Sequence, residues 1–196
     1  MILLLATNNQ HKVGEMRALL AGFDEVEVAC AADFPGVPEP VENGETFLDN
    51  ARLKACHYAD ATGLMALADD SGLMVDALGG RPGVMSARYG TDDADRIARL
   101  LREMEGVPDG ERAARFVCAM VLAGPGRVLA QTTGMLEGEI ARDPRGTNGF
   151  GYDPVFHLPA RGLRLAEVSA DEKNGISHRG TALRAMLEAM RDLLGD

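Results

Sequence analysis

The chain has 196 residues, of which 46% are hydrophobic and 26% charged, and its 30 acidic and 20 basic side chains give a formal net charge of −10. This length and composition suit one domain, or two joined lobes, with a sizeable core, and they exclude an intrinsically disordered protein. The negative charge repels nucleic-acid polymers, so an anionic substrate would need bound cations or a local cluster of basic side chains.

The cysteines and the apolar runs indicate the compartment. Cys30, Cys56 and Cys118 form no Cys-x-x-Cys pair, which favours buried thiols in a reducing compartment. The apolar start, residues 1–6, is too short for the core of a signal peptide and has no basic flank. A membrane span would need a run of about 18 to 20 apolar residues, which we do not find. We therefore expect a soluble cytoplasmic protein that does not bind membranes.

Strand-like and helix-like segments alternate along the first part of the chain. Continuous apolar runs and period-two alternation predict strands, and apolar residues three and four positions apart predict helices. The expected strands are residues 1–6, 25–30, 64–68 and 73–78, and the expected helices are residues 11–23 and 46–61. Thr46 and Asp49 resemble a capping box at the start of the second helix, whereas Asn50 and Lys54 share another of its faces.

The rest of the chain continues the same alternation. The expected elements are a helix through residues 97–104 with Thr91 as its N-cap, strands over 116–123, 128–133 and 135–140, and a C-terminal helix over 183–194. Residues 124–126, Gly-Pro-Gly, suit a hairpin between the first two of these strands. Because we find no internal repeat or linker, residues 1–196 predict a single α/β domain with a mixed sheet.

Two adjacent carboxylates, Asp69 and Asp70, lie between two apolar segments in the sequence Ala-Asp-Asp-Ser-Gly-Leu. An unpaired carboxylate in a protein interior costs several kcal/mol, so this acidic corner needs cations, donors or solvent. Mg²⁺ meets that need, because it commonly binds one or two carboxylates together with substrate phosphates. Glu42 or Glu45 could supply a third carboxylate. The alternative is a solvated Asp-Asp-Ser-Gly turn.

Polar residues 7–12 follow the first strand and lead into the first helix. They are Thr7, Asn8, Asn9, Gln10, His11 and Lys12. The backbone N–H groups and the dipole of a helix N-terminus favour an anion, and a hydroxyl, two amides and an ammonium lie beside them here. Ordinary turn and capping residues would have a similar sequence.

Two later segments carry further candidate groups and are expected to be loops. Residues 147–156 place Phe150 and Tyr152 among glycines, so an exposed ring could stack on a base, although aromatic residues at the end of a sheet more commonly belong to the core. Residues 172–180 are rich in basic and polar side chains, which could hold an anion or a base rich in carbonyls, or only solvate a loop. His178 could act as a base or only as a donor.

These segments together resemble the inosine/xanthosine triphosphate pyrophosphatase family, house-cleaning enzymes that hydrolyse noncanonical purine nucleoside triphosphates. The resemblance runs in order through LATNNQHK, ETFLDNARLKA, ADDSGLMVDALGGRPGVMSARYG, GFGYDPVF and EKNGISHRG. It implies two α/β lobes around a long mixed sheet with flanking helices, an active site in the cleft between the lobes, and a homodimer.

The resemblance also implies roles for single residues. Asp70 would be metal ligand and proton acceptor beside Asp69, Lys54 would add positive charge near the reacting phosphate, and Glu42, favoured over Glu45 by its spacing from Lys54, would help to hold Mg²⁺. Residues from two loops and from the acidic corner would bind the substrate. They are Thr7, Asn8, Asn9, Gln10, His11 and Lys12 for the triphosphate, Ser71 beside it, and Phe150, Gly151, Tyr152, Asp153, Lys173, His178 and Arg179 for the base.

The implied reaction converts a nucleoside triphosphate and water to the monophosphate and pyrophosphate, with inosine, deoxyinosine and xanthosine triphosphates as substrates. Mg²⁺ and the lysines would offset charge on the leaving pyrophosphate, and a carboxylate or the metal would activate water. Two other readings are a nucleotide sensor without activity and a phosphatase with an aspartyl-phosphate intermediate. The first would not need both aspartates beside Lys54, and the second lacks an Asp-x-Asp pattern after the first strand.

Overall fold

The structure is a computed structural model that describes residues 1–21, 23 and 26–194. Its strands are β1 (Ile2–Leu5), β2 (Glu27–Cys30), β3 (Met65–Val75), β4 (Ala113–Gly124), β5 (Arg127–Ile140), β6 (Phe156–Leu158) and β7 (Leu163–Arg164). Its α-helices are α1 (Gln10–Leu20), α2 (Phe47–Thr62), α3 (Asp93–Glu103), α4 (Ala170–Ile176) and α5 (His178–Leu194). Short 3₁₀ turns connect several of these elements.

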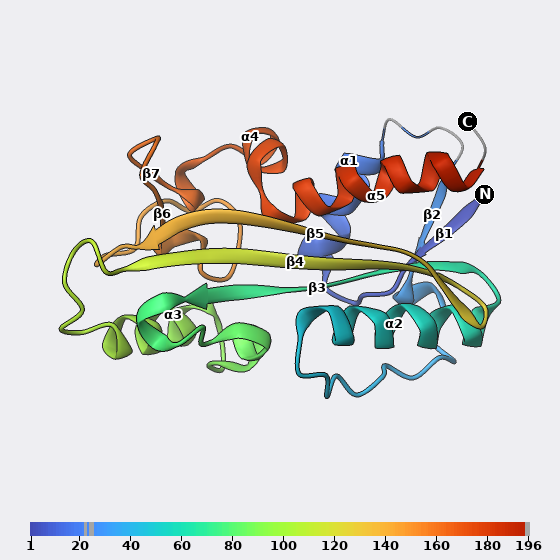
Figure 1. Cartoon of the computed structure of the whole chain (residues 1–196), viewed down its shortest axis with the longest axis horizontal. Helices are drawn as coiled ribbons and strands as arrows, with labels where there is room; N and C mark the ends of the chain where they lie inside the picture. The colour runs from blue at the N-terminus through green and yellow to red at the C-terminus, as the bar shows by residue number, and fades with distance from the viewer. Residues whose placement is uncertain (22, 24–25, 195–196) are drawn as a thin grey trace. The chain divides into compact units, whose positions relative to one another are not determined.

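Within the described residues the strands form one seven-stranded sheet in the order β2-β1-β3-β4-β5-β6-β7. Strand β1 pairs in parallel with β2 and with β3, whereas β5 and β6, and β6 and β7, pair antiparallel. The sheet is therefore mixed and, with its helices, confirms the expected α/β class (Figure 1). In the described part of the chain, no helix is long and apolar enough to cross a membrane.

The chain divides into two compact units. Unit 1 comprises Met1–Asp70, Cys118–Gly134 and Arg179–Asp196, and unit 2 comprises Ser71–Val117 and Met135–His178. Strands β3, β4 and β5 each contribute residues to both units, so neither unit is one continuous stretch of sequence.

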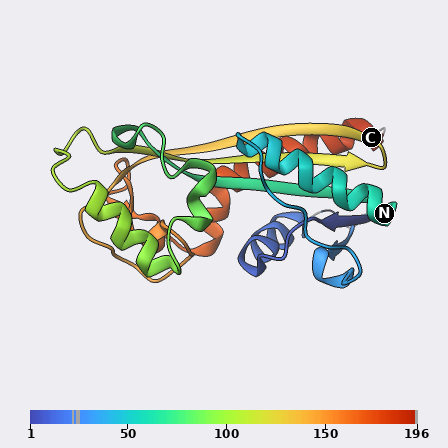
Figure 2. The same ribbon diagram turned by 90° about the horizontal axis from the view of Figure 1, so that it is seen from below.

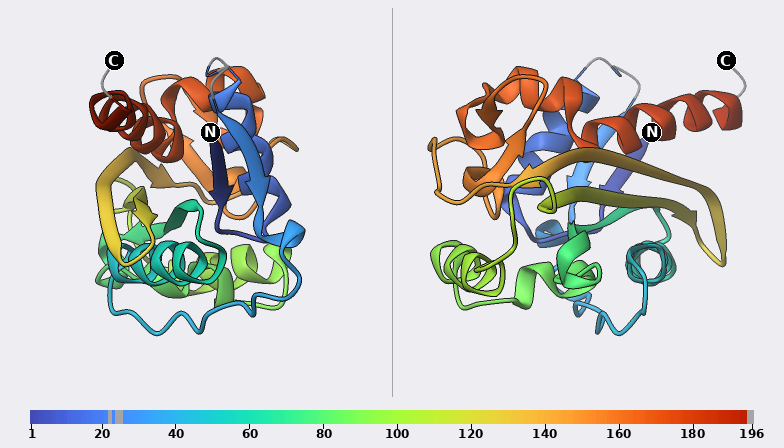
Figure 3. Two further views of the ribbon diagram at one scale, coloured as in Figure 1. Left: turned by 90° about the vertical axis from the view of Figure 1, so that its right-hand side faces the viewer. Right: turned by 60° about the vertical axis from the view of Figure 1, so that its left-hand side comes forward.

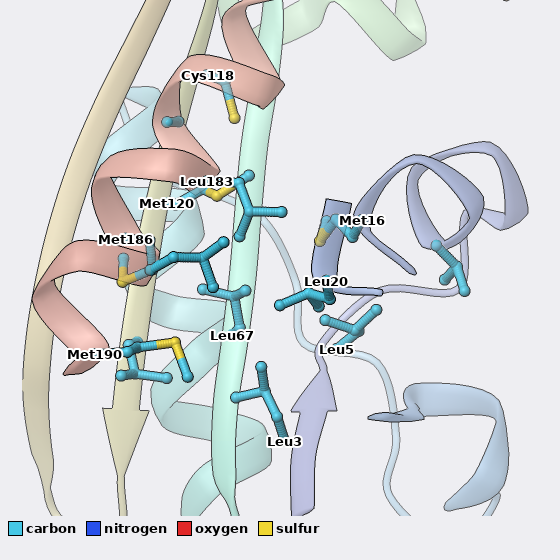
Figure 4. Close-up of a cluster of buried hydrophobic side chains, with 14 of the residues drawn as sticks. Leu3, Leu5, Met16, Leu20, Leu67, Cys118, Met120, Leu183, Met186 and Met190 are labelled. Carbon is cyan, nitrogen blue, oxygen red and sulfur yellow. The ribbon is translucent and has the colours of Figure 1, made fainter. Parts of the chain in front are cut away.

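In unit 1, helix α2 covers one face of the strands, and α1 and α5 cover the other (Figures 1, 2 and 3). Leu3, Leu5 and Leu67 point from β1 and β3 toward α1 and α5, where Met16 and Met186 meet them in one buried cluster (Figure 4). Because side chains alternate along a strand, the neighbours of these leucines face α2. This alternation also decides where the carboxylates of β3 point.

Unit 2 has a core of its own, built on the second half of β3 and on helix α3. Leu73 and Val75 from β3, Leu100 from α3 and Met104, which directly follows α3, are all fully buried in it, together with Phe156. Ile97 and Leu101 of α3 are partly buried against the same core, so the helix expected through residues 97–104 packs its apolar face there.

The structure corrects the prediction of two strands around an acidic turn. Strand β3 runs without a break through Asp69 and Asp70, so the two expected strands lie largely in one strand and the turn between them does not exist. The strand continues because the ion pairs described below satisfy the carboxylates inside the sheet, which overrides the turn preference of Asp, Ser and Gly. Strand β5 likewise continues through Gly134, where two strands were expected.

Several helix boundaries also differ from the predictions. Helix α1 ends at Leu20, before the expected end at residue 23, and Glu25 of the expected second strand lies outside the described residues. Asp92, not Thr91, caps α3, because Asp92 Oδ1 accepts a hydrogen bond from the Asp95 N–H at 2.8 Å. The capping box of Thr46 at the start of α2 is confirmed.

The segment 172–180 is not the expected loop. Its first residues, including Lys173, lie in helix α4, and His178 and Arg179 begin helix α5. Ser169, three residues before Glu172, forms a capping box with it, which starts α4 at Ala170 where no helix was expected.

A buried arginine joins α3 to the end of β5 in unit 2. The guanidinium of Arg112, a residue that is 5% exposed, donates hydrogen bonds to backbone oxygens of Ile140 at 2.6 Å and Met104 at 3.0 Å. Two weaker bonds reach the oxygens of Val107 and Ala141. One side chain therefore satisfies carbonyl groups in the segment that follows α3 and at the end of β5.

Replacing this arginine should destabilise the protein. For Arg112→Met we expect the free energy of unfolding to fall by about 3 kcal/mol, since each buried carbonyl left without a donor costs about 1 to 3 kcal/mol. Urea unfolding followed by circular dichroism measures the change. Arg102→Met, at an exposed position of α3, is the control and should shift stability by less than about 0.5 kcal/mol. Equal stability of the two variants would contradict the structural role of Arg112.

Candidate active site

The two adjacent carboxylates of β3 point to opposite faces of the sheet. Asp69 follows the alternation of Leu67 and faces α1 and α5, whereas Asp70 faces α2. Asp69 is fully buried and Asp70 is 8% exposed. One dipeptide therefore serves two separate clusters of polar side chains, both within unit 1.

The first cluster surrounds Asp69. Its Oδ2 lies 3.0 Å from the Nζ atom of Lys12 and 3.2 Å from Nη2 of Arg179, and Arg179 also pairs with Glu15. Burial raises the pKa of Asp69, but Lys12 and Arg179 outweigh burial, so the pKa lies well below its usual range. Asp69 is thus a fixed anion. Burial and this anion both raise the pKa of the nearby Cys118 thiol, which stays neutral.

The second cluster surrounds Asp70. Nζ of Lys54, a residue of α2, lies 3.5 Å from Asp70 Oδ1 and 2.7 Å from Glu42 Oε1. Asn50, one turn earlier in α2, donates a hydrogen bond from Nδ2 to Asp70 Oδ2 at 3.1 Å. The structure therefore joins a strand, a helix and the loop before that helix around one ammonium group.

Burial acts differently on the two charged groups of this second cluster. It is the largest influence on Asp70 and raises its pKa, although Lys54 and Lys12 oppose the change. Burial lowers the pKa of Lys54, but Asp70, Asp69 and Glu42 outweigh burial and raise it above the usual value. The neighbouring aspartates therefore differ: Asp69 holds no proton at neutral pH, and Asp70 has the higher proton affinity that suits an acceptor.

The two glutamates of the loop before α2 lie in different surroundings. Glu42 contacts Lys54, whereas Glu45 is exposed. Carboxylate oxygens of Glu42 and Asp70 thus both lie near the Lys54 ammonium. Such oxygens are the ligands that Mg²⁺ prefers. Because no group of three or more His, Cys, Asp or Glu side chains in the described residues could hold a metal ion, phosphate or water would have to complete the coordination.

The loop of residues 7–12 leads into the N-terminus of α1. Asn9 is the N-cap, and its Oδ1 accepts hydrogen bonds from the backbone N–H groups of His11 at 3.0 Å and Lys12 at 3.2 Å. Thr7 Oγ1 accepts one from the Asn9 N–H at 3.2 Å. Residues 8–11 are exposed. An exposed helix N-terminus therefore lies one helical turn from the partly exposed ammonium of Lys12, an arrangement suited to an anion.

In unit 2, Phe150, Asp153 and Lys173 form a third polar group. Lys173 Nζ lies 2.6 Å from Asp153 Oδ2 and 4.8 Å from the centroid of the Phe150 ring. The Phe150 N–H donates to the same Asp153 oxygen at 3.0 Å. Gly149 has a φ of +74°, and a Cβ atom there would lie 1.9 Å from that oxygen, so only glycine fits. These contacts set the position of the partly exposed Phe150.

The other predicted base-binding residues lie in different surroundings. Tyr152 is 4% exposed and its hydroxyl donates to the Ser86 oxygen at 3.0 Å, so it is a core residue of unit 2. His178 is 5% exposed and stacks on Phe116 with centroids 4.9 Å apart. Arg179, by contrast, lies in unit 1 with Asp69 as its partner.

Two further predicted residues lie next to these groups. Ser71 follows Asp70 in β3 and is partly exposed at the first position of unit 2. Gly151 donates its N–H to Asp93 Oδ2 at 2.7 Å, which ties the Phe150 segment to the first turn of α3.

Sequence reasoning gave no role to Glu15, Asn50 or Asp93, although all three contact predicted site residues. Asn50 had a visible signal, since it shares a helix face with Lys54. Glu15 lies one turn after Lys12, where it can reach Arg179 only because α1 and α5 cover the same face. Asp93 gave no local signal, because its partner Gly151 is 58 positions away.

Comparison with known proteins identifies relatives over nearly the whole chain. The sequence model of the Ham1 family matches residues 3–189. A dITP/XTP pyrophosphatase of Geobacillus kaustophilus is 50% identical, with 98% of this chain and 96% of the relative covered. One of Gloeobacter violaceus is 51% identical, with 94% and 92% covered.

A solved structure shows the same fold. The HAM1 protein of Coxiella burnetii superimposes with a TM-score of 0.89 at 42% identity, and the superposition covers 98% of this chain and 99% of that one. Because sequence and structure match over almost their full lengths, the chain belongs to the Ham1 family.

Proposed function

We propose that the protein is a nucleoside-triphosphate pyrophosphatase that removes noncanonical purine nucleotides, hydrolysing inosine, deoxyinosine and xanthosine triphosphates to the monophosphate and pyrophosphate. The observation that carries the proposal is the meeting of Glu42 and Asp70 at Lys54, with Asp69 and Lys12 on the opposite face of the same strand. The names of the relatives, dITP/XTP pyrophosphatase, support the same class of substrate.

The residues fit a magnesium ion. Glu42, in the loop before α2, and Asp70, in β3, offer carboxylate oxygens on two sides of the Lys54 ammonium. Mg²⁺ binds one or two carboxylates and completes its octahedral coordination with phosphate oxygens and water. Bound there, Mg²⁺ would lower the negative charge of the phosphate chain during its cleavage. We propose Glu42, rather than Glu45, as the second ligand because Glu45 is exposed and Glu42 contacts Lys54.

The chain's own residues would divide the remaining tasks. The exposed N-terminus of α1 and Lys12 would bind the triphosphate, and Lys54 would stabilise negative charge that develops on the leaving pyrophosphate. Asp70 would accept a proton from the attacking water, because its pKa is raised by burial while it keeps the hydrogen bond from Asn50. Asp69 would hold Lys12 in place rather than contact the substrate, since it is fully buried.

In unit 2, Phe150 would stack on the purine, and Lys173 and His178 would supply donors for base recognition. Lys173 and Asp153 order the segment around the ring. Arg179 is 2% exposed and pairs with Asp69 and Glu15, so we propose that it positions the Asp69 cluster instead of lining the base pocket. The inter-lobe cleft, the homodimer, the cytoplasmic location and the exclusion of nucleic-acid polymers stay predictions.

Asp70→Asn should abolish most of the turnover. The amide has nearly the volume of the carboxylate but can neither accept the proton nor bind Mg²⁺ as an anion, so kcat should fall by about 10²-fold or more. Pyrophosphate release from inosine triphosphate measures it, and an unchanged urea midpoint shows that the variant folds. Asp192→Asn, at an exposed position of α5, should keep full activity. Normal turnover in folded Asp70→Asn would exclude Asp70 as the acceptor.

Lys12→Ala should weaken binding of the triphosphate but not of the nucleoside, because its proposed partner is a phosphate oxygen. Calorimetric titration without Mg²⁺ compares inosine triphosphate with inosine. Raised salt should weaken triphosphate binding by the wild type in the same direction, since charge interactions are screened over about 10 Å at 0.1 M. Lys12→Arg keeps the charge and should recover part of the affinity. Equal losses for triphosphate and nucleoside would contradict a phosphate contact.

The base preference should follow the group at C6. Inosine and xanthosine carry a carbonyl acceptor at C6, whereas adenosine carries an amino donor. Donors such as Lys173 and His178 should therefore favour inosine and xanthosine triphosphates. With ATP a donor would face a donor, and this unpaired polar contact should lower the rate of hydrolysis by about 10²-fold or more. We expect kcat/KM to be highest for inosine and xanthosine triphosphates, lower for GTP through its 2-amino group, and lowest for ATP and pyrimidine triphosphates. His178→Ala should compress this order.

The products separate this proposal from its alternatives. A pyrophosphatase releases pyrophosphate, a phosphatase releases inorganic phosphate, and a sensor releases neither. ATP hydrolysed as efficiently as inosine triphosphate by the wild type would refute the house-cleaning function even if pyrophosphate were the product.

A further inference from the structure

Asn50 is a buried amide that connects Asp70 to the loop that carries Glu42, the second carboxylate proposed to hold the metal. It is 3% exposed in α2 and donates from Nδ2 to Asp70 Oδ2 at 3.1 Å. Its Oδ1 accepts a hydrogen bond from the backbone N–H of Gly44 at 2.7 Å. Gly44 lies two residues after Glu42, so one side chain contacts both the acidic strand and the loop that carries the second acid.

The chemistry of the partners determines the orientation of this amide. A backbone N–H can only donate and an ionised carboxylate can only accept, so the Asn50 oxygen must face Gly44 and its NH₂ group must face Asp70. The flipped amide would lose both bonds and leave Asp70 facing an oxygen. No other uncharged side chain of this length offers an acceptor and a donor on one rigid plane.

The contact with Gly44 is close and allows no side chain there. A Cβ atom at position 44 would lie 2.7 Å from Asn50 Oδ1, 2.7 Å from Asp49 Cβ and 3.0 Å from the Asn50 backbone nitrogen. The loop backbone is thus packed directly against the first turn of α2. A second tie lies farther along the helix, where His57 Nε2 is 2.7 Å from the Pro38 oxygen.

Lys54 alone would fix the spacing of the two acids less well. It attracts both Glu42 and Asp70, but an ammonium on a four-carbon stem is a point charge without directional preference. Coulomb attraction holds the carboxylates near the cation and not at a particular separation. The two directional hydrogen bonds of Asn50 act on the backbone of the loop and on one oxygen of Asp70.

We propose that Asn50 is a positioning residue that sets the separation of Glu42 and Asp70 and thereby the affinity of this pair for a divalent cation. The cation is taken from the proposed function, but the two hydrogen bonds are independent of it. Partners that orient the ligands of a metal typically change its affinity by about 10- to 100-fold when they are mutated.

Three variants separate the two contacts. Asn50→Asp keeps an acceptor for Gly44 but places a negative charge against Asp70. Gly44→Ala displaces the loop but keeps the amide on Asp70, and Asn50→Ala removes both contacts. Arg52→Ala, an exposed residue of the same helix that bonds to Gln131, is the matched control.

The first measurement is Mn²⁺ binding, followed by electron paramagnetic resonance with a non-hydrolysable inosine triphosphate analogue present. We expect about 10-fold weaker binding for Asn50→Asp and Gly44→Ala, a larger loss for Asn50→Ala, and no change for Arg52→Ala. In steady-state assays the concentration of Mg²⁺ at half-maximal rate should rise in the same order, and saturating Mg²⁺ should restore much of kcat. A loss of kcat that Mg²⁺ does not restore would overturn a positioning role.

The second measurement needs neither metal nor activity. Hydrogen exchange at the Gly44 amide should be slow in the wild type and in Asn50→Asp, and at least about 10-fold faster in Asn50→Ala. If the wild type hydrolyses the nucleotides but Mn²⁺ binding is the same in all variants, the inference on Asn50 fails and the proposed function stands. If the wild type binds no Mn²⁺ and shows no activity, the proposed function and the inference on Asn50 both fail. Fast hydrogen exchange at the Gly44 amide in the wild type would refute only the contact between Asn50 and Gly44.

Discussion

The structure depends on two adjacent carboxylates carried by a strand inside a sheet. Buried carboxylates are costly without partners, and a strand sends successive side chains to opposite faces. Asp69 and Asp70 therefore each need their own cation, Lys12 and Arg179 on one face and Lys54 on the other. Helices α1, α5 and α2 must cover these faces at the level of the two aspartates, which fixes where each helix lies on unit 1.

The sequence allowed prediction of most elements and of the mixed α/β class, because apolar periodicity and capping residues are local signals. It failed where long-range partners override local preference. Asp-Asp-Ser-Gly has the composition of a turn, yet β3 runs straight through it because cations from three helices satisfy the acids. Helix α4 was missed for a different reason: the capping box of Ser169 and Glu172 is a local signal, but it lies partly before the segment 172–180 that was expected to be a loop.

The candidate site was predictable as a set of residues but not as a set of contacts. Motif resemblance identified Asp69 and Arg179, yet their pairing joins residues 110 positions apart, and no sequence pattern indicates it. The same holds for Tyr152, which local sequence could assign to stacking or to the core and which the structure buries against Ser86. Among the residues to which the sequence gave no role, Asn50 alone offered a signal, its i,i+4 spacing from Lys54. The sequence could not show that its hydrogen-bond partners are Asp70 and Gly44.

The balance of charge around the aspartates bears on how an acidic protein binds a polyanion. In the ion pairs of this region three cations, Lys12, Lys54 and Arg179, meet four carboxylates, Asp69, Asp70, Glu42 and Glu15. The carboxylates hold the cations rigidly, which lowers the entropy lost on binding, but they also cancel the positive charge that a triphosphate needs. Under the proposed function, tight binding therefore requires positive charge that enters with the nucleotide. A divalent cation that replaces Lys54 as the partner of Glu42 and Asp70 would meet this need, and it would release the ammonium to face the phosphates.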